Sequence, residues 1–398
     1  REASVALGAQ LTVGRIEAGW RGFNPRLLLH DVRLTGSAGE ARLALPQVDA
    51  EVSWMSVPRL SLRLASLSVL APELEVRRLG PMRLSVAGFV LEPREEPAAD
   101  GSPLLDWVLG QGRISLRDAR VEFIDDALAA DGAPPPRYAF SEVQLTVIGG
   151  ATSTRLSLQA RPPAELAGSL DLRGDFRHSF FRPPSALSEW RGRLYMQLDT
   201  ADLARTAGVA RVLPVPIRLE RAQGAIRAWA DIDQMTLKRF TADVVLSDVR
   251  AVAGEGLAPL EVTALQGRFT QREWGNAFRG GQELQLERFS LQGRGLALPP
   301  TDLRYRYTRG SSGDEATRDG ARLPRTEFEA SLLSLDTLTQ LASHFPLARE
   351  LRQRVARQDV RGTLSDLKLD FDGRMDAPDR FALRTRFDGL STSAQPAE

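Results

Sequence analysis

The sequence contains no cysteine and only three histidines, and its lysines stand only at positions 238 and 368. The absence of cysteine excludes disulfides, iron–sulfur clusters, thiolate zinc sites and cysteine nucleophiles. His30, His178 and His344 are too far apart in sequence to form the pair of histidines, one helical turn apart, that binds many metals. We therefore expect no metal site and no cofactor.

The chain also lacks a long apolar run and an excess of one charge. No apolar stretch reaches the roughly 18 to 20 residues that span a bilayer, so we expect no transmembrane helix within this sequence. The 52 basic and 51 acidic residues are interspersed, which argues against the basic stripe that nucleic acids require. The residues after Arg1 do not form a signal peptide, so we expect the targeting segment to be missing.

Motifs for catalysis are missing as well. The Gly-x-Gly pairs at 110/112, 254/256 and 293/295 lack the third glycine of a nucleotide-binding loop and lie between strand-like segments, which is typical of turns. Asp125 and Asp126 are adjacent, and adjacent strand residues face opposite ways, so they do not form a glycosidase carboxylate pair. We expect no enzymatic activity and no catalytic residue.

The dominant pattern in the chain is an alternation of apolar and polar residues that recurs from Leu27 to Phe387. Such alternation predicts strands with one apolar face, and we expect roughly twenty of them, separated by turn signals such as Gly149 with Gly150. The gaps are too short for helical crossovers between most strands, which favours an antiparallel meander. At 398 residues, the chain forms either two or three globular domains or one elongated array.

The apolar face needs a cover, which is a second sheet, a layer of helices or an apolar ligand. The predicted helices are too few to cover it, so we predict a mostly β fold: an elongated, curled antiparallel sheet that forms an open hydrophobic groove, capped or interrupted by a few short helices. The residues predicted to line the groove are Leu62, Leu64, Ile114, Leu116, Leu145, Val147, Leu156, Leu158, Leu170, Leu172, Leu194, Met196, Leu198, Ile226, Val244, Leu246, Leu284, Leu286, Leu369 and Phe371.

The alternation slips by one residue at Asp31, Asp118, Asp248 and Asp366. One extra residue that redirects the following side chains is what a β-bulge supplies, and repeated bulges curl a sheet. The alternative interpretation is that these aspartates lie in turns that are unrelated to one another.

Helical patterns are few. The sequence predicts a helix that ends near Gln10, a short helix at Pro103–Leu109, a helix at Ala201–Val212 capped by Thr200, and a helical pair at Ser334–Gln358 broken at Pro346. The chain then divides into residues 1–91, which begin the groove, a mobile loop at 92–103, a continuous β-groove at 104–333, the helical pair at 334–358, further groove strands at 359–390 and a flexible tail at 391–398.

Several segments resemble the AsmA-like family, specifically its YhdP branch. Val13–Val32 followed by Val48–Trp54 is similar to the start of these proteins, and so is Leu104–Val108 leading into Ile114–Val121. The resemblance implies a Gram-negative protein that is anchored to the inner membrane by one N-terminal transmembrane helix. It also implies a long periplasmic β-groove that carries phospholipid toward the outer membrane. Members of this branch are much longer, so the chain would be an N-terminal portion.

Two other functions fit the same residues. A scaffold or assembly chaperone for outer-membrane proteins would use exposed sheet edges for strand addition. A pair of closed β-sandwiches, as in a surface or carbohydrate-binding protein, would pack the apolar faces against each other. Under the lipid hypothesis the partners are phospholipid acyl chains, the inner membrane and an outer-membrane-side partner.

Overall fold

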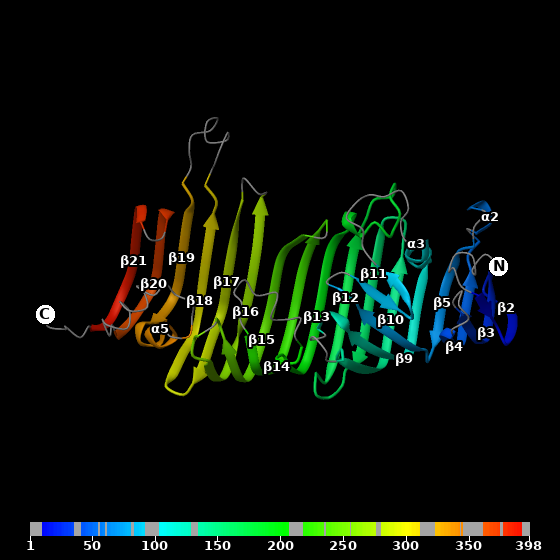
Figure 1. Ribbon diagram of the computed structural model, residues 1–398. Coiled ribbons are helices and arrows are strands. Elements are labelled where there is room, and N and C mark those ends of the chain that lie inside the picture. The colour runs from blue at the N-terminus through cyan, green and yellow to red at the C-terminus, as the bar shows by residue number, and fades with distance from the viewer. Residues whose placement is uncertain are drawn as a thin grey trace. The chain divides into compact units, whose positions relative to one another are not determined.

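The computed structural model describes residues 10–35, 41–54, 56–59, 62–80, 83–91, 103–128, 134–206, 218–234, 236–254, 256–275, 280–310, 323–342, 344, 361–374 and 377–391. Strands make up most of these residues (Figure 1), which confirms the predicted mostly β fold. The chain forms two compact units. The first consists of Arg1–Leu198 with Asp231–Thr236, and the second of Asp199–Ala230 with Leu237–Glu398.

The strands that lie wholly or mainly in the first unit are β1 (Gln10–Thr12), β2 (Arg15–Arg21), β3 (Asn24–Thr35), β4 (Ala41–Val52), β5 (Leu64–Leu70), β6 (Glu73–Arg78), β7 (Leu84–Val86), β8 (Phe89–Leu91), β9 (Arg113–Asp125), β10 (Arg137–Gly149), β11 (Ser153–Arg161), β12 (Ser169–Arg177) and β13 (Arg191–Asp202). Those of the second unit are β14 (Arg218–Asp233), β15 (Thr236–Val252), β16 (Leu260–Gly275), β17 (Gly280–Gly293), β18 (Leu296–Thr308), β19 (Arg325–Ser334), β20 (Arg361–Arg374) and β21 (Ala377–Ser391).

The sheet of the first unit is antiparallel except at one step. β3 pairs with β2 and β4, β4 pairs with β5, and β9 to β12 pair in sequence order, all antiparallel. β5 and β6 instead run parallel to β9. The expected antiparallel meander is wrong at this step, because the connection from β6 to β9 contains the β7–β8 hairpin and a helix and is long enough for a parallel crossover.

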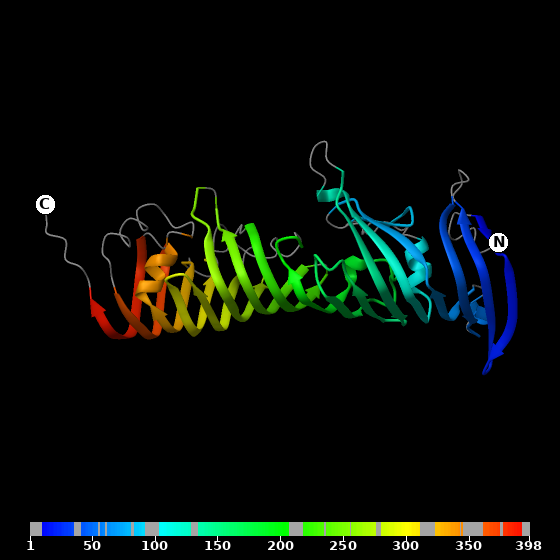
Figure 2. The ribbon, with the colours of Figure 1, turned by 90° about the horizontal axis from the view of Figure 1, so that it is seen from below.

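The strands of the second unit pair in sequence order from β15 to β21, and each is antiparallel to the next. Among the described strands no pairing joins β21 back to β15, so these strands do not close into a barrel. Figure 2 shows these strands curving, with helix α5 (Leu335–Ala342) on the inner side of the curve.

The helices are short. They are α2 (Ser56–Arg59), α3 (Pro103–Leu109) and α5, with 3₁₀ turns η1 (Asp126–Leu128) and η2 (Leu187–Glu189). α3 confirms the helix predicted at these residues. α5 begins after Ser334, as predicted, and the Ser334 hydroxyl caps it by accepting the Thr337 N–H at 3.2 Å.

The helix predicted at Ala201–Val212 is wrong where the structure describes the chain. Ala201 and Asp202 end strand β13, and a turn follows in which the Asp202 carboxylate accepts the Ala204 N–H at 3.1 Å. Such local side-chain bonds compete with helix formation. Residues 207–212, most of the predicted helix near the N-terminus, the second half of the 334–358 pair, the loop at 92–102 and the tail at 392–398 lie outside the described residues.

The aspartates at the predicted phase slips all have left-handed backbone conformations, with φ of 53° at Asp31, 53° at Asp118, 47° at Asp248 and 52° at Asp366. Aspartate tolerates this conformation better than most residues. The strand register shifts at Asp118 and Asp366, as a bulge requires.

The register of Asp31 and Asp248 with the next strand does not shift, so the predicted bulge in the pairing is absent there. The reason is that the apolar alternation shifts by one residue in both paired strands at the same position along the pairing. Leu29 lies opposite Val48, and Val32, three residues on, lies opposite Leu45. The slip therefore keeps apolar residues on one face on both sides of the left-handed residue.

Buried apolar side chains gather in small separate clusters. Their centres are Val32, Val48 and Val69 in one cluster, Leu109, Phe176 and Trp190 in the second, and Ala330, Leu333 and Leu367 in the third. The largest side chains that are completely buried are Ile124, Thr154, Thr301 and Pro72. No leucine or phenylalanine belongs to that group, which is unusual for the interior of a folded domain.

Candidate functional site

The strand register of the first unit places apolar side chains in rows that cross the sheet. One row takes one residue from each of β2, β3, β4, β5, β9, β10, β11 and β12 and consists of Ile16, Leu29, Val48, Val69, Leu116, Leu145, Leu158 and Leu172. The next row consists of Ala18, Leu27, Ala50, Leu67, Ile114, Val147, Leu156 and Gly174. Paired residues share a face, so these rows form one apolar face.

The opposite face of the same strands is polar. The row between the two apolar ones contains Glu17, Leu28, Asp49, Ser68, Ser115, Thr146, Ser157 and Arg173. Arg26 donates two hydrogen bonds to Asp49, at 2.7 and 2.8 Å, and this guanidinium holds the pKa of the Asp49 carboxyl below its ordinary value. Ion pairs such as this one therefore satisfy charged side chains of this face.

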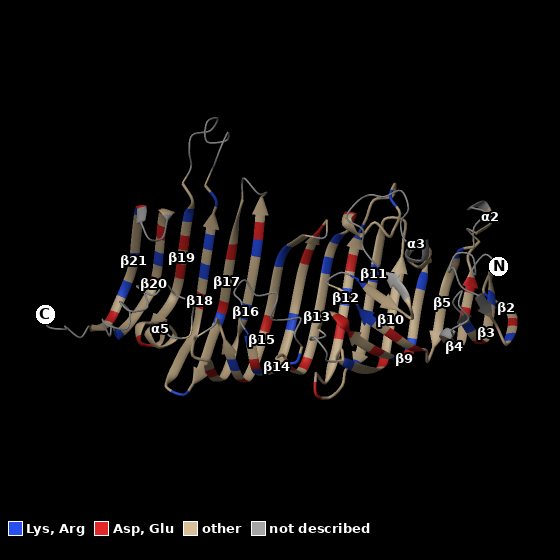
Figure 3. Cartoon of the chain, viewed as in Figure 1, with Lys and Arg blue, Asp and Glu red and all other residues tan. Residues whose placement is uncertain are grey.

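The second unit repeats the arrangement. One apolar row consists of Ala242, Phe269, Leu286, Leu303, Ala330 and Leu367, and its neighbour of Phe240, Gln271, Leu284, Tyr305, Phe328, Leu369 and Leu383. Charged residues of both signs lie on the other face, where Arg304 contacts Glu283 at 3.3 Å and Glu329 at 3.9 Å. Figure 3 shows the alternating charges along these strands.

Most side chains of the apolar rows are half-buried rather than buried. This holds for Leu145, Leu158 and Leu172 in the first unit and for Leu284 and Phe328 in the second. Neighbouring side chains of the same row cover their flanks, so the part of each that stays exposed faces the space in front of the sheet. A sealed sandwich interior would bury these residues.

Protein covers the apolar face only locally in the described residues. In the first unit, α3 and the segment around η2 contribute Leu109, Leu187 and Trp190 to a cluster with Phe176. The Asp106 carboxylate accepts the Ser185 N–H at 2.9 Å, which ties α3 to this segment. In the second unit, α5 packs on β18, β19 and β20.

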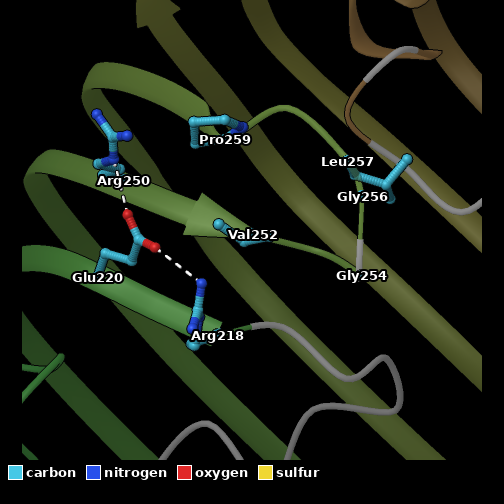
Figure 4. Close-up of a pocket in the computed structure, with 8 residues that line it drawn as sticks. All are labelled: Arg218, Glu220, Arg250, Val252, Gly254, Gly256, Leu257 and Pro259. Atoms are coloured by element: carbon cyan, nitrogen blue, oxygen red, sulfur yellow. Dashed lines mark hydrogen bonds and ion pairs between the residues drawn. The ribbon is translucent and has the colours of Figure 1, made fainter.

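A pocket in the second unit is lined by two arginines and the carboxylate that lies between them. Its volume is ≈ 690 Å³, and Arg218, Glu220, Arg250, Val252, Gly254, Gly256, Leu257 and Pro259 line it (Figure 4). Glu220 accepts hydrogen bonds from Arg218 at 3.0 Å and from Arg250 at 2.7 Å, so the carboxylate is held between two cations.

Among the described residues, no group of three or more acidic, histidine or cysteine side chains is arranged to hold a metal ion. Within the same ranges, no helix has both the length and the apolar character to cross a membrane.

An open sheet with an apolar face, found in each of the two units, is the architecture that the sequence resemblance implied. The model of the YhdP family, described as YhdP protein, matches residues 1–397. The chain belongs to the YhdP family. A comparison with curated proteins gives no match.

The YhdP-family fold brings most of the predicted lining residues of the first unit onto the apolar rows. Ile114, Leu116, Leu145, Val147, Leu156, Leu158 and Leu172 lie in them, and Leu170 lies opposite Ala160. A register shift brings Leu64 opposite Val52. Leu62 lies outside any strand and is 39% exposed, so it does not join the rows.

The remaining predicted residues lie on β13 and in the second unit. Leu194 joins the Trp190 cluster, Met196 and Leu198 alternate with it along β13, and Ile226 is buried on β14. Val244 lies opposite Gly267, and Leu246 opposite Leu265. Leu284, Leu286, Leu369 and Phe371 lie on the apolar face.

The sequence prediction missed row members on the early strands and polar residues on the apolar face. Leu29, Val48 and Val69 occupy row positions whose alternation was visible in the sequence. Tyr305 and Tyr307 also occupy apolar-face positions of an alternating strand. Burial raises the pKa of the Tyr305 phenol above its ordinary value.

Proposed function

We propose that this chain binds phospholipid acyl chains on its apolar face and forms part of a periplasmic conduit that moves lipid between the inner and outer membranes. The observation that supports this most directly is the row from Ile16 to Leu172, which is apolar on every paired strand. Acyl chains would supply the cover that the described protein does not.

The energetics favour movement along such a face. Exposing an acyl chain to water costs about 0.8 kcal/mol per CH₂, so a free lipid does not cross an aqueous compartment readily. Successive row positions such as Leu116, Leu145 and Leu158 present nearly the same surface. A lipid tail that moves between them meets a nearly level free energy, so we propose a passive, non-catalytic conduit whose direction is set elsewhere.

The compartment and anchoring belong to the same proposal. Family membership supports a place in the cell envelope. We propose that the chain lies in the periplasm and that a preceding transmembrane helix anchors the full-length protein to the inner membrane.

A pair of adjacent substitutions on β11 tests the proposal. Leu158 lies on the apolar face and Ser157 on the polar face. Native mass spectrometry of the purified chain should show bound phospholipid in the wild type and in Ser157→Glu, and a loss of it in Leu158→Glu. Both variants should keep the far-ultraviolet circular dichroism of the wild type.

Equal lipid content in the two variants would contradict binding on this face. A wild-type chain that carries no lipid but binds extended peptides at its sheet edges would instead support the assembly-chaperone function.

A further inference from the structure

Polar side chains interrupt the apolar face of the second unit near one end of its strands. We define Gln271, Gln282, Tyr305, Tyr307 and Thr326 as the polar belt. Gln271 and Tyr305 flank Leu284 in one row, and Gln282, Tyr307 and Thr326 form the next. β16 ends at Gly275 and β17 begins at Gly280, so the belt lies close to this end of the strands.

The other end of the same strands is covered by α5. The helix packs on β18, β19 and β20, and the Thr337 hydroxyl donates to the Ala297 carbonyl at 2.8 Å. Leu291, Leu298 and Leu333 are buried at this end. The apolar face of this unit is therefore a strip with polar groups at one end and a helix at the other.

The strip is long enough to hold an acyl chain. From Leu284 to Leu291 strand β17 advances about 23 Å at ~3.3 Å per residue. One leaflet of a bilayer has a hydrocarbon depth of roughly 15 Å, half of the ~30 Å core. An acyl chain that lies along the strands therefore fits between the belt and α5.

The chemistry of the belt suits the polar part of a phospholipid. The Thr326 hydroxyl and the Tyr305 phenol hydrogen-bond to each other, and Tyr305 and Tyr307 are half-buried while Gln282 is exposed. Hydroxyls and amides can donate hydrogen bonds to ester carbonyls and phosphate oxygens. The Glu273 position, opposite Gln282, adds a carboxylate toward the strand ends, which complements the ammonium of a zwitterionic headgroup.

We infer that the polar belt orients phospholipid in the second unit, with the glycerol esters and phosphate against the belt and the acyl chains directed along the strands toward α5. This inference rests on the proposed lipid binding and adds a direction to it. It identifies Tyr305 and Tyr307 as positioning residues for a diacyl, zwitterionic lipid.

Single cysteines test the orientation, because the natural chain has none. Phe381 lies level with the belt, in the row of Thr326 and Phe371, and Phe387 lies opposite Leu364 near the α5 end. Both side chains are exposed, at 67% and 57%, and they are about 20 Å apart along β21. Phe381→Cys and Phe387→Cys are each labelled with a fluorophore and mixed with phosphatidylcholine that carries a nitroxide quencher on its headgroup or on its acyl end.

The headgroup nitroxide should quench the label at 381 more than the label at 387, and the acyl-end nitroxide should do the reverse. Two hydroxyl hydrogen bonds of ordinary net strength change the ratio of two orientations by on the order of tenfold. Tyr305→Phe with Tyr307→Phe should therefore remove the contrast without lowering lipid content. Thr270→Val, which removes a hydroxyl that lies 3.3 Å from Thr241 on the opposite face, should keep it.

Equal quenching of both labels by both probes, with lipid bound, would overturn the orientation and leave the proposed lipid binding standing. A reversed contrast would do the same. Absence of quenching together with absence of bound lipid in native mass spectrometry would overturn the proposed function, and the inference with it.

Discussion

Asp118 and Glu142 lie on the neighbouring strands β9 and β10, and both have left-handed backbone conformations, with φ of 53° and 52°. Around them the register shifts by one residue and then shifts back: Val143 lies opposite Ala119, and Leu145 lies opposite Leu116. The two irregularities offset each other. The apolar rows on either side of them therefore remain aligned.

The left-handed conformation at Asp118 should restrict what can replace it. A β-branched residue is strained at positive φ, whereas glycine is not. We expect Asp118→Val to destabilise the first unit by about 1–3 kcal/mol and Asp118→Gly to have a much smaller effect. Urea unfolding followed by circular dichroism would measure both. Equal midpoints for the two variants would contradict a structural role of this conformation.

Close strand packing at Gly192 gives a second prediction. A Cβ atom there would meet the Asp175 carbonyl oxygen and lie 2.7 Å from the Phe176 Cα, and neither backbone atom can move aside easily. We expect Gly192→Ala to cost about 1–3 kcal/mol. Gly19→Ala is the control, because nothing lies within 4 Å of its added Cβ. Thermal unfolding of the two variants checks this, and a Gly192→Ala protein as stable as the control would refute it.

The Asp243–Arg268 pair on the polar face predicts a pH dependence. Arg268 donates hydrogen bonds to Asp243 at 2.6 and 2.8 Å and lowers the pKa of that carboxyl below its ordinary value of 3.8. The pair therefore contributes stability above about pH 4, and this is lost as pH falls through the lowered pKa. Both side chains are more than a third exposed to solvent, at 40% and 35%. We therefore expect the pair to contribute at most about 1 kcal/mol to the free energy of unfolding.

Asp243→Asn measures this contribution. Its melting temperature should be lower than that of the wild type at pH 7, and the difference should shrink toward zero near pH 2. A difference of the same size at both pH values would mean that the carboxylate charge is not responsible.

The sequence alone predicted the strands, the single apolar face and the positions where the alternation slips, because side-chain direction in a strand follows a period of two. It could not predict that β5 and β6 pair in parallel with β9, since the pairing partner after a long connection depends on contacts that are distant in the chain. The turn at Asp202 was missed for a related reason. Helical spacing at 201–212 is a local pattern, and the strand β13 that precedes it extends two residues further than that pattern indicates.

The polar belt was also beyond the sequence analysis. Gln271, Gln282 and Tyr307 are ordinary polar residues in the sequence, and only the register of β16, β17 and β18 brings them together on the apolar face. An alternating strand in which a polar residue occupies an apolar phase is the signal that could have found them.

Substitutions of two adjacent valines on β15 distinguish an effect on lipid transport from an effect on folding. Val244 lies opposite Gly267 on the apolar face, whereas Val245 lies opposite Gln266 on the other face and is 60% exposed. We expect Val244→Glu to stay folded and soluble but to block lipid passage, because a carboxylate in the path of the acyl chains is costly to desolvate. Charged substitutions of Leu172 and Leu198 should act in the same way.

Val245→Glu is the matched control and should leave passage unchanged. Passage is measured in the full-length protein as the transfer of labelled phospholipid between two membrane fractions, and folding by circular dichroism. Unfolding of Val244→Glu alone would indicate that Val244 belongs to a sealed core. The loss of stability in Val244→Glu would then come from lost packing between protein side chains, and not from placing a charge in the path of lipid tails.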